Sequence, residues 1–178
     1  MNDLAELTGV WKIDNAHSYV DFSIRHFLAN PKGSINNIDG TIDFGDDYHL
    51  GNVDIVIDVN SMDTGNEDRD EHLMSDDFFD VANYPSITFK SNAIERLSDG
   101  YLVTGTLSIK DKTGDAQIKF EYMGSQESPF KEGLFVAALQ GEMVIDRNAF
   151  GITGYSGVLG EEVTIIISSE IDQDRSGE

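Results

Sequence analysis

The chain has 178 residues, a length that suits one domain with a sizeable apolar core. Its 33 acidic and 12 basic side chains give a net charge of −21, which repels nucleic acid and anionic membrane surfaces at long range. The absence of cysteine excludes disulfides, thiolate metal sites and a cysteine nucleophile. The charge is typical of an adaptation for solubility, and an acidic surface for a basic partner is the second interpretation.

The first 14 residues, MNDLAELTGVWKID, contain neither a basic segment nor a long apolar one. They lack both features of a secretory signal peptide. No run in the chain approaches the roughly 18 apolar residues of a membrane span. We therefore expect a cytoplasmic protein without stable membrane insertion.

Period-two alternation of apolar and polar residues, the pattern of a half-buried β-strand, dominates the chain. In the stretch NAHSYVDFSIRHF (15–27), one face carries Val20, Phe22, Ile24 and His26. Arg25 lies on the opposite face, where we expect it to pair with a carboxylate of a neighbouring strand. Similar runs follow at 38–45, 52–60, 85–94, 100–110, 116–124, 134–146 and 161–171.

Turn residues, among them Gly45-Asp46-Asp47 and Asp99-Gly100, separate these runs. Eight or so antiparallel strands, each with one apolar face, must bury those faces together. A single open sheet of this size would leave two edges and one bare face. The alternation therefore predicts a mainly all-β fold, either a closed barrel or a two-sheet sandwich.

The segment NEDRDEHLMSDDFFD (66–80) breaks the alternation and predicts a short helical insertion near residues 66–77. Asn66 suits the N-cap, and the acidic residues after it suit the first turn, where the helix dipole favours negative charge. Arg69, His72 and Leu73 have i, i+3, i+4 spacing and therefore share one helix face. We expect this helix to lie across the mouth of a barrel.

No motif indicates catalysis or metal binding. The chain lacks a G-x-S-x-G nucleophile elbow and an evident Ser/His/Asp order. Its four histidines, His17, His26, His49 and His72, form no H-E-x-x-H or similar short-spaced motif. His49, in DDYHL, is interpreted as a plain surface residue. We predict no catalytic residue, no bound metal and no cofactor.

Six sequence motifs occur in one order along the chain: WKIDNAHSYVDFSIRH (11–26), GTIDF (40–44), DVNSMDTGNEDRDEHLMSDDFFD (58–80), NYPSITFKS (83–91), VTGTLSIK (103–110) and DRNAFGI (146–152). This series resembles the YceI-like family of lipocalin-like lipid-binding proteins. The resemblance spans about residues 10–171, so residues 1–178 are identified as a single YceI-like domain with loose termini. Asp111 stands where the family commonly has glycine, which bears on a local turn and not on the fold.

The resemblance implies an extended eight-stranded antiparallel lipocalin-like β-barrel with a helix, enclosing a long apolar cavity. Members of the family are associated with polyisoprenoid lipids such as isoprenoid quinones and polyprenyl phosphates. The resemblance implies that this chain binds a long-chain amphiphilic lipid, an isoprenoid quinone or a polyprenyl phosphate, in the barrel cavity. It would then serve as a carrier or reservoir and not as an enzyme.

A filled barrel and a hollow one show the same alternation. The alternation alone therefore favours the ordinary case, in which inward side chains pack against one another. The resemblance favours the cavity, where each buried ligand methylene is worth about 0.8 kcal/mol. On that interpretation the candidate lining residues are Phe22, Phe44, Phe78, Phe79, Phe89 and Phe120.

The polar head of such a lipid needs hydrogen-bond donors, and the arginine fork suits phosphate oxygens. The candidates are Arg69 and His72 on the predicted helix, and Arg147 beside the DRNAFGI motif. For each arginine the alternative is an ordinary salt bridge with one of the 33 acidic residues. His26 is a further candidate ligand contact, although a histidine on an apolar face is more often a core residue.

Two other functions stay open. An enzyme acting on a small lipid, with a histidine as general base, predicts a histidine close to a carboxylate or serine in a wet pocket. A stress-related interaction protein with an acidic functional surface predicts an interior filled by side chains and salt-sensitive binding. An unpaired strand edge or an apolar barrel rim would favour a homodimer.

Overall fold

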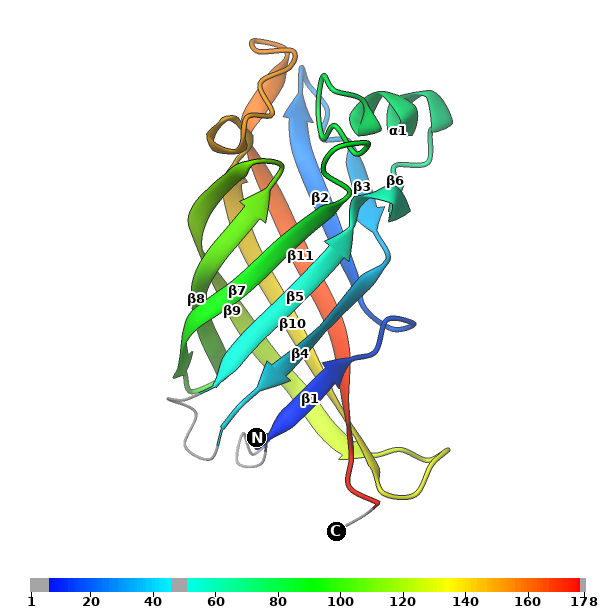
Figure 1. The fold of residues 1–178 in the computed structure, drawn as a ribbon, viewed down its shortest axis with the longest axis vertical. Coiled ribbons are helices and arrows are strands. Elements are labelled where there is room, and N and C mark those ends of the chain that lie inside the picture. Colours follow the sequence, from blue (N-terminus) through cyan, green and yellow to red (C-terminus); the bar gives the residue numbers. More distant parts are fainter. Residues whose placement is uncertain (1–6, 46–50, 177–178) are drawn as a thin grey trace.

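The computed structural model describes residues 7–45 and 51–176, which fold into antiparallel strands with one short α-helix (Figure 1). The helical segments are α1 (Glu67–Met74) and the 3₁₀ turns η1 (Val59–Ser61) and η2 (Arg147–Phe150). The strands are β1 (Val10–Ile13), β2 (Tyr19–His26), β3 (Lys32–Ile35), β4 (Ile38–Asp43), β5 (Asn52–Asp58), β6 (Met62–Asp63), β7 (Ser86–Arg96), β8 (Gly100–Ile109), β9 (Lys112–Glu127), β10 (Leu134–Asp146) and β11 (Leu159–Asp174).

Eight of these strands form a closed barrel. They pair antiparallel in the order β1-β4-β5-β7-β8-β9-β10-β11, and β11 pairs with β1 to complete the ring. The closing pair is short, with Lys12 opposite Asp172 and Ile13 opposite Ile171. Closure removes the two edges that an open sheet would expose. The predicted eight-stranded antiparallel barrel is confirmed, and the sandwich alternative is wrong.

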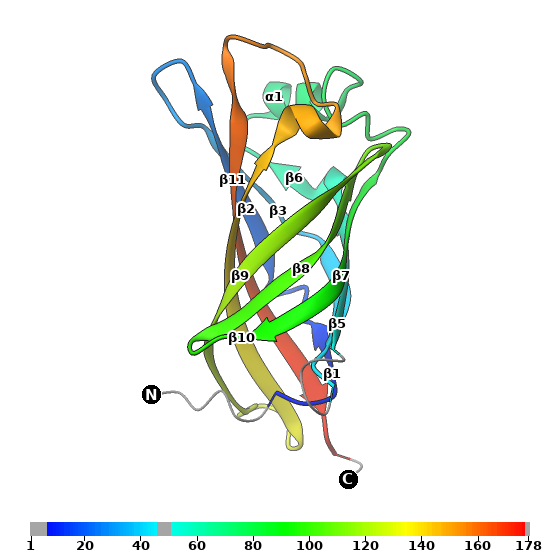
Figure 2. The ribbon, with the colours of Figure 1, turned by 90° about the vertical axis from the view of Figure 1, so that its left-hand side faces the viewer.

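Three further strands, β2, β3 and β6, extend the sheet beyond the closed barrel at one end. β11 has 16 residues, so it pairs with β1 near its C-terminal end and with β2 nearer its beginning. β2 then pairs with β3, and β3 with β6, at the end where α1 lies (Figures 1 and 2). The sequence patterns predicted β2 but not β1, β3 or β6. Those three have two to four residues each, which is too short to display alternation.

Large buried side chains pack toward the end of the barrel that is drawn lowest in Figure 1. Trp11, Phe44 and Tyr101 are almost completely buried, and the rings of Phe44 and Tyr101 lie 5.2 Å apart. Trp11 Nε1 donates to the carbonyl oxygen of Thr8 at 3.0 Å, which satisfies its one polar atom. Phe44 was predicted to line a cavity. That prediction is wrong, because Phe44 packs in this closed end.

The helical insertion predicted near residues 66–77 is confirmed as α1, which ends at Met74. The side chain of Asn66 caps it by accepting a hydrogen bond from the backbone N–H of Arg69. Three acidic residues occupy its first turn, where they interact favourably with the helix dipole. α1 buries none of its residues and lies at the rim of the barrel (Figure 1). No helix in residues 7–45 and 51–176 is long and apolar enough to cross a membrane.

Two predicted turns have different outcomes. At Asp99-Gly100 the chain does turn, and the N–H of Leu97 donates to the carbonyl oxygen of Gly100 at 2.9 Å. The turn predicted at Gly45-Asp46-Asp47, together with His49, falls on residues 46–50, which lie outside the described residues. The unusual Asp111 follows Lys110, which adopts a φ of +55° in the tight turn between β8 and β9.

Candidate functional site

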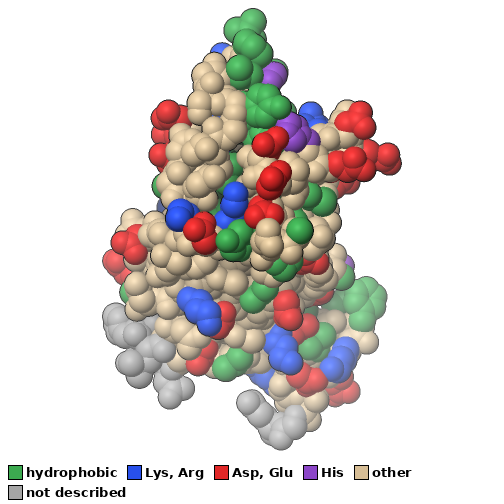
Figure 3. Space-filling model, turned by 45° about the horizontal axis from the view of Figure 1, so that its top comes forward, with side chains coloured by type: hydrophobic (Ala, Val, Ile, Leu, Met, Phe, Trp, Pro, Cys, Tyr) green, Lys and Arg blue, Asp and Glu red, His purple; other side chains and the backbone are tan. Residues whose placement is uncertain are grey.

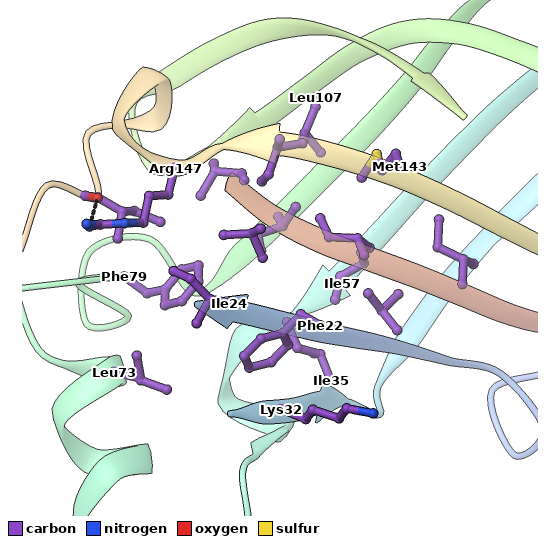
Figure 4. Close-up of a pocket in the computed structure, with 18 of the residues that line it drawn as sticks. Phe22, Ile24, Lys32, Ile35, Ile57, Leu73, Phe79, Leu107, Met143 and Arg147 are labelled. Carbon is purple, nitrogen blue, oxygen red and sulfur yellow. Dashed lines mark hydrogen bonds between the residues drawn. The ribbon is translucent and has the colours of Figure 1, made fainter. Parts of the chain in front are cut away.

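The barrel encloses a cavity of about 720 Å³, within the range of small-molecule and cofactor sites. It opens at the rim formed by α1, the β2–β3 hairpin and the loop 151–158, and we call this opening the mouth. The wall is mostly aliphatic and aromatic because the strands direct their apolar faces inward. Figure 4 shows side chains from several strands converging on this space, among them Phe22, Ile24, Ile35, Ile57, Leu107 and Met143.

A dry void of this volume would be costly. At about 24 cal/mol per Å³ it would destabilise the fold by about 17 kcal/mol, which exceeds the net stability of about 5–15 kcal/mol typical of a protein. Because the cavity is open at the mouth, either water or an apolar guest occupies it. An aliphatic wall offers water few hydrogen-bond partners, so the wall suits an apolar guest.

Five of the six phenylalanines predicted to line a cavity do lie in its wall: Phe22, Phe78, Phe79, Phe89 and Phe120. The strands β2, β7 and β9 supply three of them, and the segment after α1 supplies Phe78 and Phe79. This segment is tied to the end of β8, because Lys110 Nζ donates to the carbonyl oxygen of Phe78 at 2.8 Å. The cavity wall therefore continues from the strands onto the insertion.

An aromatic cluster lies at the mouth. The ring of His72 meets Phe78 at 5.1 Å and Tyr155 at 5.5 Å, edge-on in both cases, and Phe78 and Tyr155 stack at 5.8 Å. His72 Nε2 also lies 3.2 Å from Asp77 Oδ2. The cluster joins the helical insertion to the loop before β11. Sequence reasoning missed Tyr155, which occurs in a glycine-rich loop without periodicity and has a φ of +57°.

Arg147 is only 3% exposed and lies beside the cavity. Its guanidinium donates four hydrogen bonds to backbone carbonyl oxygens, those of Ile152 (2.6 Å), Gly160 (2.7 Å), Gly154 (2.8 Å) and Leu159 (3.4 Å). Within the described part of the chain, no carboxylate lies within 4 Å of it. The salt-bridge alternative for Arg147 is therefore wrong. The side chain fastens the loop 151–158 to the start of β11, and one of its five N–H groups has no acceptor among the described residues.

Arg69 extends from α1 to the mouth and is oriented by Thr64. Its Nε donates to Thr64 Oγ1 at 2.7 Å, and its Nη2 donates to the carbonyl oxygen of the same residue at 2.6 Å. The threonine hydroxyl in turn donates to Asp70 Oδ1 at 2.5 Å. Arg69 itself makes no ion pair with any described carboxylate. The predicted common face of α1 is confirmed, because Arg69, His72 and Leu73 all line the cavity.

His26 lies at the rim and not in the core. Its side chain borders the mouth but is exposed, and its ring contacts Phe27 edge-on at 5.1 Å. The neighbouring Arg25 was expected to pair with a carboxylate. That expectation is wrong for the described residues, since Arg25 Nε donates instead to the carbonyl oxygen of Phe27 at 2.6 Å.

The charges around the cavity differ in sign from those of the whole protein. Among the described residues, the lining contains no Asp or Glu, although the chain has 33. Apart from Tyr155, its ionisable members are all basic: His26, Lys32, Arg69, His72 and Arg147. Figure 3 shows histidine and basic side chains at this end, with acidic side chains on both sides of them and between them. The lining is therefore basic within a strongly acidic molecule, while the acidic side chains of this end lie outside the cavity wall.

A second ionisable cluster lies outside the cavity, where the turn after β1 meets β11. His17 Nδ1 lies 2.8 Å from Asp14 Oδ2 and 3.8 Å from Glu170 Oε2. The hydrogen bond to Asp14 raises the pKa of His17, and the same bond lowers the pKa of Asp14. These three groups are close enough to share a cation, but the ion pair between His17 and Asp14 already accounts for their arrangement.

Comparison with known proteins agrees with this architecture. A model of the YceI-like domain matches residues 11–171. The UPF0312 protein of Yersinia pestis (strain Pestoides F) is 32% identical over 164 residues, which cover 90% of this chain and 84% of that protein.

Two solved structures are also similar. The YceI protein of Campylobacter jejuni superposes with a TM-score of 0.74 at 27% identity, covering 84% of this chain and 88% of that one. A polyisoprenoid binding domain from Saccharophagus degradans has a TM-score of 0.69 at 16% identity, covering 91% and 97%, a likeness that shows the fold alone. Since the domain match extends over nearly the whole chain, this protein belongs to the YceI-like domain family.

Proposed function

We propose that this protein binds a long-chain amphiphilic lipid, an isoprenoid with an anionic head group such as a polyprenyl phosphate, and serves as its carrier or reservoir. One observation carries the proposal: an apolar cavity of about 720 Å³ has basic side chains, and no described Asp or Glu, among the residues that line it. The similar domain from Saccharophagus degradans, described as polyisoprenoid-binding, supports an isoprenoid chain.

The wall of the cavity accounts for the apolar part of the ligand. A chain threaded between Phe22, Ile57 and Leu107 would exchange water for close-packed carbon, at about 0.8 kcal/mol for each buried methylene. It would also remove the energetic cost of a poorly hydrated interior. Such contacts are insensitive to chemical detail, so they favour any apolar chain of suitable width and do not select the head group.

The basic side chains at the mouth account for an anionic head. Lys32 and Arg69 have N–H groups available and no carboxylate within 4 Å in the described ranges, so an anion would gain charge-assisted hydrogen bonds there. Arg147 contributes positive charge, but its donors are mostly engaged with carbonyl oxygens. A neutral quinone would leave this charge unmatched, which is why we favour a phosphate.

The two rival functions receive less support. The enzyme hypothesis requires a histidine near a carboxylate or serine in a wet pocket. His72 does lie 3.2 Å from Asp77, but the Asp77 side chain is 65% exposed and lies outside the cavity wall. The acidic interaction protein predicted an interior filled by side chains, and the cavity contradicts that requirement.

The experiment compares three probes with the same tail and different heads: geranylgeranyl monophosphate, geranylgeraniol, and a menaquinone with a geranylgeranyl side chain. Native mass spectrometry of protein purified from cells first identifies the bound lipid, and titration then ranks the probes. We expect the monophosphate to bind most tightly. Equal binding of all three would overturn the anionic head, and failure of all three to bind would overturn lipid carriage.

A further inference from the structure

The tip of the β2–β3 hairpin presents two adjacent apolar side chains to solvent. Phe27 is 67% exposed and Leu28 is 92% exposed. Backbone hydrogen bonds of 2.9 Å in both directions between His26 and Ala29 close the hairpin around them. Single exposed apolar residues are ordinary on a soluble protein, but an adjacent pair at the end of a projecting hairpin marks an interaction surface.

The backbone holds this tip in one shape. Phe27 has a φ of +49°, a left-handed conformation that costs a residue with a side chain about 1 kcal/mol. Its carbonyl oxygen accepts from Arg25 Nε at 2.6 Å, and its N–H donates to the carbonyl oxygen of Val158 at 3.3 Å. The hairpin tip is thus braced against the loop before β11, with its apolar side chains directed outward.

The tip is continuous with the mouth of the cavity. His26 and Ala29, on either side of the tip, both line the cavity, whereas Phe27 and Leu28 do not. Figures 1 and 2 show the hairpin projecting at the same end as α1 and the loop before β11. The lining of the cavity therefore extends to the two residues that flank the hairpin tip, and it includes no described carboxylate.

The charge of the hairpin selects the kind of partner. The segment FSIRHFLANPKGSINN (22–37) contains no acidic residue in a chain that has 33. Arg25 and Lys32 flank the apolar tip, and neither is in an ion pair with a described carboxylate. Two cations beside two apolar side chains match a phospholipid surface, where phosphates lie above acyl chains. A basic or purely apolar protein surface would leave these cations without partners.

We propose that the hairpin tip Phe27-Leu28 docks this protein onto zwitterionic phospholipid bilayers, with Arg25 and Lys32 at the phosphates and the mouth facing the membrane. Zwitterionic lipid is specified because the overall charge of −21 opposes anionic bilayers. Glu161 and Glu162, which share a surface hollow with Arg25, also repel anionic lipid. Docking would let a lipid pass between bilayer and cavity without exposure to water. This extends the proposed carrier function, but membrane binding itself needs no ligand in the cavity.

The test is flotation with phosphatidylcholine vesicles at physiological ionic strength. The variant Phe27→Asn/Leu28→Ser removes the apolar tip without changing charge, and asparagine tolerates the left-handed conformation. The matched control is Phe130→Ser, which removes a phenylalanine that is 96% exposed in the β9–β10 hairpin at the other end. We expect the wild type and the control to float with the vesicles, and the affinity of the tip variant to fall by about tenfold or more.

Two further readouts make the outcome decisive. A tryptophan at the tip, Leu28→Trp, should shift its fluorescence to the blue on adding vesicles, whereas Phe130→Trp should not. The native Trp11 is 1% exposed and gives a constant background. The docking proposal is overturned if the wild type does not bind vesicles, if the tip variant binds as well as the control, or if the tip variant instead converts a dimer to a monomer with vesicle binding unchanged.

Failure of docking and failure of the carrier function are separable. The tip variant should bind geranylgeranyl monophosphate as the wild type does, because neither residue lines the cavity. Vesicle binding without any binding of the lipid probes would leave docking intact and overturn carriage. Probe binding without vesicle binding would do the reverse.

Discussion

The guanidinium of Arg147 donates a hydrogen bond of 2.6 Å to the carbonyl oxygen of Ile152, five residues further along the chain. Three more carbonyl oxygens between residues 154 and 160 accept from the same side chain. A buried charge must find polar partners, and here carbonyl dipoles take the place of a carboxylate. One side chain therefore fixes the loop that carries Tyr155 and also leaves positive charge at the mouth.

Replacing Arg147 by leucine should destabilise the protein. The four carbonyl oxygens would lose their donors, and leaving buried acceptors unsatisfied costs about 1–3 kcal/mol each before relaxation. We expect a net loss of about 3 kcal/mol in the free energy of unfolding, measured by urea denaturation. Amide hydrogen exchange should also quicken at Ile152, whose N–H donates to the carbonyl oxygen of Arg147.

Two variants define the controls for this experiment. Arg147→Lys keeps the charge but not the planar fork, so it should recover only part of the lost stability. Arg69→Leu removes an exposed arginine and should change stability by less than about 1 kcal/mol. If Arg147→Leu and the wild type unfold at the same midpoint urea concentration, the stability of the loop does not depend on this side chain.

Filling the cavity should weaken lipid binding with little loss of stability. Ile57 on β5 lines the cavity, and its neighbour Val56 is exposed on the outer face of the same strand. Ile57→Trp places a large ring in open space, so the usual penalty of about 1–3 kcal/mol for overpacking should not apply in full. We expect the affinity for geranylgeranyl monophosphate to fall by about tenfold or more in Ile57→Trp and to stay unchanged in Val56→Trp, as measured by titration. Equal effects of the two variants would place the ligand outside the barrel.

Removing the free cations at the mouth should weaken binding of the charged probe selectively. Arg69→Gln and Lys32→Gln each remove a donor that has no described carboxylate partner, and a charge-assisted hydrogen bond is worth about 1.5–3 kcal/mol. We expect each variant to lower the affinity for geranylgeranyl monophosphate by about tenfold and to leave geranylgeraniol unaffected. Lys90→Gln, which removes a cation paired with Asp54 on the outer wall at 3.0 Å, is the control for net charge. A parallel loss for both probes would contradict head-group recognition.

Period-two alternation was sufficient to predict the long antiparallel strands, because every strand of six or more residues in the described chain shows it. The choice of a barrel over a sandwich came from the family resemblance. The same pattern failed for Phe44. Alternation shows that a side chain faces inward but not its height along the barrel axis, and this height decides between the cavity wall and the closed end. The height follows from strand tilt and from the β1–β11 closure, which pairs residues some 160 positions apart and leaves no local signal.

The candidate site was predictable where a helix fixes its geometry and less so in loops. Arg69 and His72 could be assigned to one face because helical spacing is regular. The role of Arg147 depends instead on how the loop 151–158 and the start of β11 fold back. The arginine in its motif was visible in the sequence, but its carbonyl partners were not. Tyr155 and the tip of the β2–β3 hairpin were missed for the same reason, since turns have no periodicity.

The pair formed by His17 and Asp14 should make stability depend on pH. Their hydrogen bond raises the pKa of His17 and lowers that of Asp14. A raised histidine pKa gives stability that is fully present below the unfolded value of about 6.5 and lost as pH rises through the folded value. A lowered aspartate pKa gives stability that is present above about 3.9 and lost as pH falls through the folded value. The contribution is therefore largest between about pH 4 and pH 6.5.

Thermal unfolding of the wild type and His17→Gln across this range measures the effect. We expect the difference in Tm to be largest near pH 5 and to shrink as pH rises above about 7, and an NMR titration should show the His17 pKa falling toward its ordinary value in Asp14→Asn. His26→Gln controls for loss of an imidazole, because His26 is exposed and makes no ion pair with a described residue. If the Tm difference for His17→Gln is the same at low and high pH, the ion pair with Asp14 does not contribute to stability. The backbone turn after β1 would then be the source of the Tm difference.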